Sequence, residues 1–371
     1  MDTSALQALT AQVLWAAFFL SVLFGVLAQR THFCTMGAVS DIVTVGDWTR
    51  MRMWGMAIGV AMIGFYTLAV AGQIDPAKTL YASSRVIWLS ALVGGSLFGF
   101  GMVLASGCGS KTLVRIGGGN LKSVVVFLVM GIAAFATLKG ISAVVRVATI
   151  DRIALDFSGN AALSNWLGNA IGLTPSGAGL VLALVLGLAL IIWALLGRDF
   201  VRFDNLLAGF GIGAVIVAMW WVSGHLGYVA EHPDTLQEAF LATNSGRAEA
   251  LSFVSPVAYT LDWFMFFSDK SKLLTIGIVS VFGVVAGSAV YALATRNFRW
   301  EGFRDAEDTA NHLVGAVLMG VGGVCAMGCT VGQGLSGIAT LSMTSFVAVA
   351  SILAGCVAAL KYQLWRLERR T

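Results

Sequence analysis

Charged side chains are scarce in this sequence. Only 11% of the 371 residues are Asp, Glu, Lys or Arg, whereas 58% are hydrophobic, and the mean hydropathy is +0.85. A soluble domain carries about a quarter charged residues, so this composition predicts a membrane protein that crosses the bilayer several times. The net charge is only +4 and the basic residues are scattered. Without a basic stripe, we expect no nucleic-acid partner.

Histidine and proline are also rare, and cysteine is missing from the long polar connections. There are four histidines, and no predicted span carries an obvious Asp, Glu or His proton relay. The four prolines fall between the spans, so any helix broken inside the membrane would be broken by some of the 44 glycines. None of the five cysteines lies where a structural disulfide would be expected. We predict no cofactor and no resident metal.

Several apolar runs are long enough to cross a bilayer, which takes roughly 20 residues. The first run belongs to the mature protein by our interpretation, because only Asp2 is charged before it and no convincing cleavage site precedes Gln29. The sequence therefore predicts an all-α polytopic membrane protein, with residues 1–371 forming a single transport domain. The nine predicted spans are 11–28, 52–73, 86–106, 121–138, 177–197, 204–223, 273–294, 311–327 and 344–362.

The distribution of Lys and Arg predicts the orientation of these spans. With the N-terminus outside and the C-terminus in the cytoplasm, 15 of the 23 basic residues fall in inside segments, as the positive-inside rule requires. The two long polar connections, 139–176 and 224–272, then lie outside. We predict a multi-pass protein of the bacterial inner membrane, in contact with the lipid bilayer.

A duplicated segment indicates an internal repeat. Residues 92–108 read LVGGSLFGFGMVLASGC and residues 313–329 read LVGAVLMGVGGVCAMGC, with ten of 17 positions identical. The two copies run in opposite directions in the predicted topology, which is typical of inverted-repeat transporters, whose substrate site lies at the repeat interface. We therefore expect repeat halves 1–176 and 177–371. The matching glycines are Gly94/Gly315, Gly99/Gly320 and Gly101/Gly322.

Each copy ends in a glycine-rich segment that contains a cysteine. Glycines beside Cys108 and Cys329, among them Gly107 and Gly328, permit sharp reversals with positive φ. Irregular backbone at membrane depth is tolerated only where protein shields it or a wet cavity adjoins it. A short helix that begins at such a break points its free amides and positive dipole end at the cavity, which suits an anion. A similar pattern surrounds Cys34, after the first span.

Two further cysteines fit packing better than function. Cys356 stands in the middle of the last span, and Cys325 precedes Cys329 at helical spacing. Free cysteine often behaves as a small buried hydrophobe, so we interpret Cys356 as a packing residue and Cys325 as a packing or supporting one.

Three segments together resemble the YeeE/YedE family of membrane proteins, whose characterised members take up thiosulfate. They are AQRTHFCTMGAVSD (28–41), GFGMVLASGCGSKTLVRIGGGNLKS (99–123) and GAVLMGVGGVCAMGCTVGQGLSG (315–337). The resemblance implies nine membrane helices and short re-entrant helices in an hourglass shape. It also implies that Cys34, Cys108 and Cys329 line the passage and relay the substrate through weak S–H···S contacts. A TusA-like sulfurtransferase often works on the cytoplasmic side.

The chemistry of the residues agrees with a sulfur anion. A neutral thiol is a weak donor and a weak acceptor, so it can hold a polarizable sulfur loosely, and conduction needs weak, multi-site binding. Arg30, Lys111 and Arg115 stand near the motif ends as candidate funnels, although ordinary positive-inside charge also explains them. Lys111 departs from the family pattern and Gln333 occupies a variable position, so another sulfur or selenium species remains open as substrate.

Other functions are weighed against transport of a sulfur anion. A membrane thiol oxidoreductase would use Cys325 and Cys329, but their spacing is not C-x-x-C. Metal transport would use soft thiolates with His32, but no Met-rich or His-rich tract accompanies them. A structural subunit that docks a sulfur carrier would not need the glycine breaks. We expect a transporter rather than an enzyme, with channel-like and ion-coupled transport both open.

Overall fold

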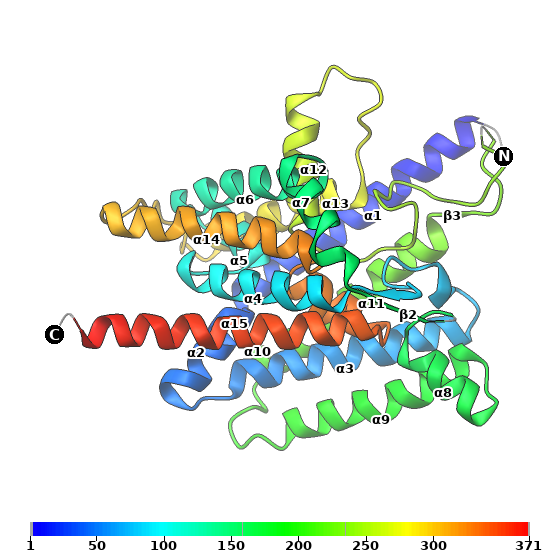
Figure 1. Ribbon diagram of the computed structural model, residues 1–371, viewed down its shortest axis with the longest axis horizontal. Coiled ribbons are helices and arrows are strands. Elements are labelled where there is room, and N and C mark those ends of the chain that lie inside the picture. Colours follow the sequence, from blue (N-terminus) through cyan, green and yellow to red (C-terminus); the bar gives the residue numbers. More distant parts are fainter. Residues whose placement is uncertain (1–2, 158, 234, 370–371) are drawn as a thin grey trace.

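The computed structural model describes residues 3–157, 159–233 and 235–369. Figure 1 shows helices that lie broadly along one long axis, with the N-terminus and the C-terminus at opposite ends. The helices of membrane-spanning length are α1 (Thr3–Arg30), α3 (Thr49–Val70), α4 (Trp88–Leu104), α6 (Leu121–Lys139), α9 (Pro175–Leu195), α13 (Ile276–Ala294), α14 (Ala306–Cys325) and α15 (Met343–Glu368). The helix α11 (Ile212–Trp221) is the middle part of a further continuous helical segment, Phe203–Leu226.

Shorter elements complete the chain. The short α-helices are α2 (Thr35–Val45), α5 (Gly109–Gly117), α7 (Ile141–Ala148), α8 (Leu163–Ile171), α10 (Phe203–Leu206) and α12 (Ser255–Met265). Turns of 3₁₀-helix form η1 (Pro76–Lys78) and η2 (Ile150–Arg152), and π-helical turns form η3 (Leu207–Gly211), η4 (Val222–Leu226) and η5 (Gly332–Gly337). The strands of the described residues form two antiparallel pairs, β1 (Arg85–Val86) with β2 (Leu155–Asp156) and β3 (Tyr228–Val229) with β4 (Ala239–Phe240).

The all-α polytopic fold is confirmed. In the described part of the chain, eight helical segments are long and apolar enough to cross a membrane. The ninth predicted span, 311–327, corresponds to α14, whose first turns carry Glu307, Asp308 and His312 and so lower its hydropathy. α14 nevertheless packs along both α4 and α6. Counted with α14, the described residues hold nine helical segments long enough to cross a membrane, and this odd number agrees with termini at opposite ends (Figure 1).

The connections gather at two ends of the helix bundle. The end that holds the N-terminus, called the N face below, carries the connections 71–87, 140–174 and 227–275. The end that holds the C-terminus, called the C face, carries 46–48, 118–120, 196–202 and 295–305. Both long polar connections of the sequence therefore lie on the N face.

Two of the three duplicated glycine pairs, Gly94/Gly315 and Gly101/Gly322, form the contact between α4 and α14. A Cβ added at Gly101 would lie 2.7 Å from the carbonyl oxygen of Gly315, and one added at Gly94 would lie 2.7 Å from that of Gly322. Gly101 thus contacts the repeat partner of Gly94, and Gly94 contacts the repeat partner of Gly101. This reciprocal pattern is that of a two-fold contact. Such small-residue contacts let backbones approach closely in a membrane.

The predicted halves share one core. α15 packs on α4, α13 packs on α1 and α5, and α9 packs on α3. A single large hydrophobic cluster runs through residues of both halves. The helices of both halves therefore pack into one hydrophobic core. The division of the chain into repeat halves at 176/177 stays a prediction.

Candidate functional site

The same helix break occurs three times. Each break is four residues long and joins the end of a long helix to the start of a short one. The breaks are 31–34 between α1 and α2, 105–108 between α4 and α5, and 326–329 between α14 and the helical segment 330–339, which contains η5.

The backbone of the three breaks has one conformation. A residue with φ near +55° stands two positions before each cysteine: His32 (52°), Ser106 (56°) and Met327 (56°). The next amide donates to a carbonyl five residues back, in the pairs Phe33–Ala28 (3.2 Å), Gly107–Met102 (2.8 Å) and Gly328–Gly323 (2.8 Å). This is the Schellman ending of a helix.

The helices were predicted to end at glycines, and this is correct only in part. At the second break Ser106, not Gly107, takes the left-handed conformation, and at the first break His32 takes it. Glycine normally occupies that position because it has no Cβ penalty. Left-handed non-glycine residues cost about 1–3 kcal/mol each and cluster at functional sites.

Each motif cysteine is the N-cap of the short helix that follows. Cys34 Sγ accepts from the Gly37 amide at 3.5 Å and Cys329 Sγ accepts from the Gly332 amide at 3.4 Å. Cys108 is the N-cap residue of α5, and its Sγ lies 3.3 Å from Ser110 Oγ. The thiols therefore stand where Ser, Thr, Asp or Asn usually cap a helix.

The three cysteines converge in the interior. Cys108 lies within electrostatic range of both Cys34 and Cys329, and the Thr330 hydroxyl adjoins Cys108. Cys34 is 5% exposed, and Cys108 and Cys329 are fully buried. We call these three residues the thiol cluster. It collects three short-helix N-termini, each with a positive dipole end.

Cys325 lies apart from the thiol cluster. Its side chain packs where a Cβ on Gly94 would point, and its carbonyl accepts from Ser90. Cys356 is buried on α15 beside Gly99 of α4. All five cysteines, each in the described part of the chain, are free thiols.

A cavity of about 230 Å³ lies on the N face and extends as far as Ser252, the neighbour of Cys329. Ser252 lines it, and Ser252 Oγ lies 4.0 Å from Cys329 Sγ. Behind Ser252, the Tyr81 hydroxyl donates to the Gly332 carbonyl at 2.6 Å and so anchors the segment after Cys329. We call it the N-face cavity. Its lining also includes Leu80, Leu138, Arg146, Asn244, Ser245, Glu249, Ala250, Ser255, Pro256, Tyr259, Gly277, Val324 and Met327.

Cations lie on the other side of the thiol cluster, toward the C face. Lys111 is within electrostatic range of both Cys34 and Cys108, and Arg115 is near Lys111. Arg30 points elsewhere, because it pairs with Asp204 at 2.9 Å. Of the three basic residues proposed as funnels, Lys111 therefore adjoins the cluster and Arg115 lies next to Lys111.

Arg50 was missed by the sequence analysis. It forms a two-pronged ion pair with Asp41, including an Nη2–Oδ1 contact of 2.6 Å, and its guanidinium packs against Gly37. Both Arg50 and Lys111 act electrostatically on His32. Arg50 lies 16 residues beyond Cys34 in the next helix, so sequence spacing gave no signal for it.

Gln333 supports the third break. Its side chain is 1% exposed, and its Nε2 donates to the Ala326 carbonyl at 2.8 Å. This bond ties the segment 330–339 to the turn that precedes it. Gly328 also stands beside the Gln333 side chain.

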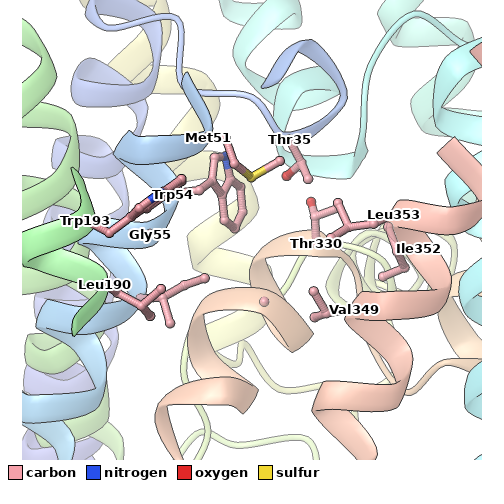
Figure 2. A pocket seen from close by; sticks show the side chains of 12 residues that line it. Thr35, Met51, Trp54, Gly55, Leu190, Trp193, Thr330, Val349, Ile352 and Leu353 are labelled. Carbon is pink, nitrogen blue, oxygen red and sulfur yellow. The ribbon is translucent and has the colours of Figure 1, made fainter. Parts of the chain in front are cut away.

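A second cavity, of about 240 Å³, lies between α3, α9 and α15 (Figure 2). Thr35 and Thr330, which follow Cys34 and Cys329 in sequence, lie next to each other at one edge. The remaining lining is largely apolar and includes Trp54 and Trp193. An apolar wall offers few donors to an anion, so we do not place the anion path through this cavity.

Taken together, the fold and the three capped breaks define a polytopic membrane transporter whose centre is built from buried thiols and helix N-termini. A family model described as sulphur transport matches residues 30–358 of the chain. The chain therefore belongs to the sulphur-transport family, as the YeeE/YedE resemblance predicted. Membership of a family of transporters agrees with the expectation that the protein is not an enzyme.

Known relatives carry names that describe transport. The chain is 26% identical to the thiosulfate transporter TsuA of Escherichia coli K12, over 90% of each protein. It is also 26% identical to TsuA of Spirochaeta thermophila, over 91% of this chain and 94% of the relative. A probable transporter, YedE of Escherichia coli K12, is 30% identical over 30% of this chain and 26% of its own length.

Proposed function

We propose that this protein carries thiosulfate, or a closely related sulfur anion, into the cytoplasm through the thiol cluster. The observation that carries the proposal is the convergence of Cys34, Cys108 and Cys329, each buried and each capping a short helix. The relatives named as thiosulfate transporters support the choice of substrate.

The chemistry of the caps favours such a cargo. Sulfur is a weaker hydrogen-bond acceptor than oxygen, so a thiol cap leaves the helix amides available to an arriving anion. The positive ends of the helices attract the anion, while the polarizable sulfur atoms of the cysteines meet its terminal sulfur. Lys111 and Arg115 stand toward the C face and cap none of the three short helices, so thiols and helix amides make the central contacts and keep binding weak enough for conduction.

The proposed path runs from the N face to the C face. The anion would enter the N-face cavity, pass Ser252 to Cys329, move to Cys108 and Cys34, and leave beside Lys111. This direction places the N face outside and the C face in the cytoplasm, as the distribution of basic residues predicts. The Lys111 side would then be where a TusA-like sulfurtransferase collects the cargo.

The membrane potential opposes this direction. At a membrane potential of 100 mV, negative inside, moving a dianion into the cytoplasm costs about 4.6 kcal/mol of free energy. Net uptake therefore needs a higher concentration of the anion outside than inside, consumption of the anion in the cytoplasm, or coupling to the inward movement of a cation.

The test is uptake of ³⁵S-thiosulfate into proteoliposomes that contain the full-length protein. We expect uptake by the parent and by Cys356→Ala, whose thiol is buried in the middle of α15 and caps no helix. Cys34→Ala, Cys108→Ala and Cys329→Ala should each lose it. Uptake retained by all three would remove the thiol mechanism, and no uptake by the parent at any pH would remove thiosulfate as the substrate.

A further inference from the structure

One acidic side chain stands in the wall of the N-face cavity. Glu249 precedes Ser252, the residue that contacts Cys329, by three positions, and it is only 9% exposed. An anion that approaches Cys329 through this cavity would lie in a space whose wall includes the Glu249 side chain. An ionised carboxylate there would repel a dianion in a setting where burial limits screening.

The Glu249 carboxyl is held by neutral donors. Its Oε2 accepts from the Ser245 hydroxyl at 2.9 Å, and the amides of Asn244 and Ser245 also donate to the carboxylate. The Glu249 amide donates to Ser223 Oγ at 3.1 Å. These contacts fix the position of the carboxyl without adding a positive charge.

The charged and titratable groups around Glu249 do not neutralise it. Tyr81 and Tyr259 face it from neighbouring segments, and Cys329 lies deeper beyond Ser252. Arg146 lines the same cavity, but it already pairs with Asp151 at 3.5 Å. Farther off, Arg247 donates to the Ala82 carbonyl, Lys78 pairs with Glu238, Lys139 lies over Tyr259 and Lys272 pairs with Asp262.

Burial therefore governs the ionisation of this group. It raises the pKa of Glu249 to about 7, against the smaller opposing effect of its hydrogen bonds. Below pH 7 the carboxyl is mostly protonated and neutral, and above pH 7 it is mostly ionised.

We propose that Glu249 is a proton-binding site whose protonation admits the anion to the N-face cavity, so that a proton and the sulfur anion bind together. This inference rests on the proposed function and deepens it. The proton moves from solvent to a Glu249 carboxylate oxygen, and no bond to sulfur forms or breaks. By linkage the effect is reciprocal: anion binding favours the protonated carboxyl as much as the proton favours the anion.

The linkage gives a defined pH profile. If only the protonated form accepts the anion, the apparent Kd equals the Kd of that form divided by the fraction of protein in which Glu249 is protonated. With a pKa of about 7, thiosulfate should bind about tenfold more weakly at pH 8 than at pH 6. The sign follows from the group: a carboxyl loses its proton as pH rises, and affinity falls with it.

The test is calorimetric titration of the purified full-length protein with thiosulfate at pH 6, 7 and 8, in buffers of different ionisation enthalpy. We expect about one proton to be taken up per anion at pH 8, with the tenfold loss of affinity. Glu249→Gln should bind with the low-pH affinity of the parent at every pH and take up no proton. Glu238→Gln, the same change at an exposed N-face glutamate, should behave like the parent.

The outcomes separate the two proposals. Retention of the parent's pH dependence by Glu249→Gln would overturn the role of Glu249. The role of Glu249 would also be overturned if the parent bound thiosulfate without pH dependence or proton uptake. This measurement uses the unmodified protein, so it does not depend on the folding of a variant. Absence of thiosulfate binding at every pH, together with absence of uptake in proteoliposomes, would instead overturn the proposed function.

Discussion

The cysteines of the thiol cluster serve two purposes at the scale of single residues. Each begins a short helix as its N-cap, and each presents a polarizable sulfur at the centre of the molecule. The usual caps, Ser, Thr, Asp and Asn, accept hydrogen bonds more strongly. The position is therefore not optimised for helix stability, which is consistent with selection for sulfur chemistry.

This leads to a prediction in which stability and transport separate. Cys329→Ser keeps the size of the side chain and supplies a better cap, so the free energy of unfolding should stay equal or rise by up to about 1 kcal/mol. Thiosulfate uptake should nevertheless fall as far as in Cys329→Ala, because the soft sulfur is gone. Thermal unfolding in detergent and proteoliposome uptake measure the two effects.

Cys356→Ser is the matched control for this change. It places the same hydroxyl in α15, where Cys356 is buried by packing, and it should lower stability while leaving uptake in the folded fraction intact. Full uptake by Cys329→Ser would show that a hydroxyl suffices and that the terminal sulfur is not recognised by the thiol.

At the scale of helices, the contact between α4 and α14 depends on glycine. Gly101→Ala would place a Cβ 2.7 Å from the Gly315 carbonyl oxygen, and Gly322→Ala would place one 2.5 Å from the Phe98 amide nitrogen. Because backbone atoms cannot yield as side chains do, we expect each change to cost about 1–3 kcal/mol. The midpoint of thermal unfolding reports this loss.

Gly302→Ala is the control, since nothing lies within 4 Å of its added Cβ. Its unfolding midpoint should match that of the parent. Equal midpoints for Gly101→Ala and Gly302→Ala would contradict the close contact of the two repeat helices.

The breaks show how far sequence could lead at this scale. The duplicated glycines and the terminal Gly-Cys pairs predicted broken helices, and breaks stand at Cys34, Cys108 and Cys329. The left-handed residues were not predictable, because Ser106 and Met327 are poor candidates for that conformation and tertiary packing overrides their preference. Arg50 and Glu249 were missed because long-range folding, not spacing, brings them to the site.

At the scale of the whole molecule, the N face and the C face should lie on opposite sides of the membrane. Gln237→Cys on the N face and Gly302→Cys on the C face both introduce exposed thiols. In intact cells, a membrane-impermeant maleimide should label the first and spare the second until the membrane is opened. The parent, whose five cysteines are buried, is the blank. Labelling in the reverse order would invert the proposed direction of transport.

The burial of the thiol cluster also limits, by size, the reagents that can reach its sulfur atoms. An electrophile or an oxidant can modify Cys329 or Cys108 only after travelling through the same opening as the cargo, because neither sulfur is exposed at the surface. The largest reagent that inactivates the carrier therefore measures the narrowest point before the modified thiol. Sensitivity to peroxide in a living cell would be set by the width of that opening as well as by the reactivity of the sulfur.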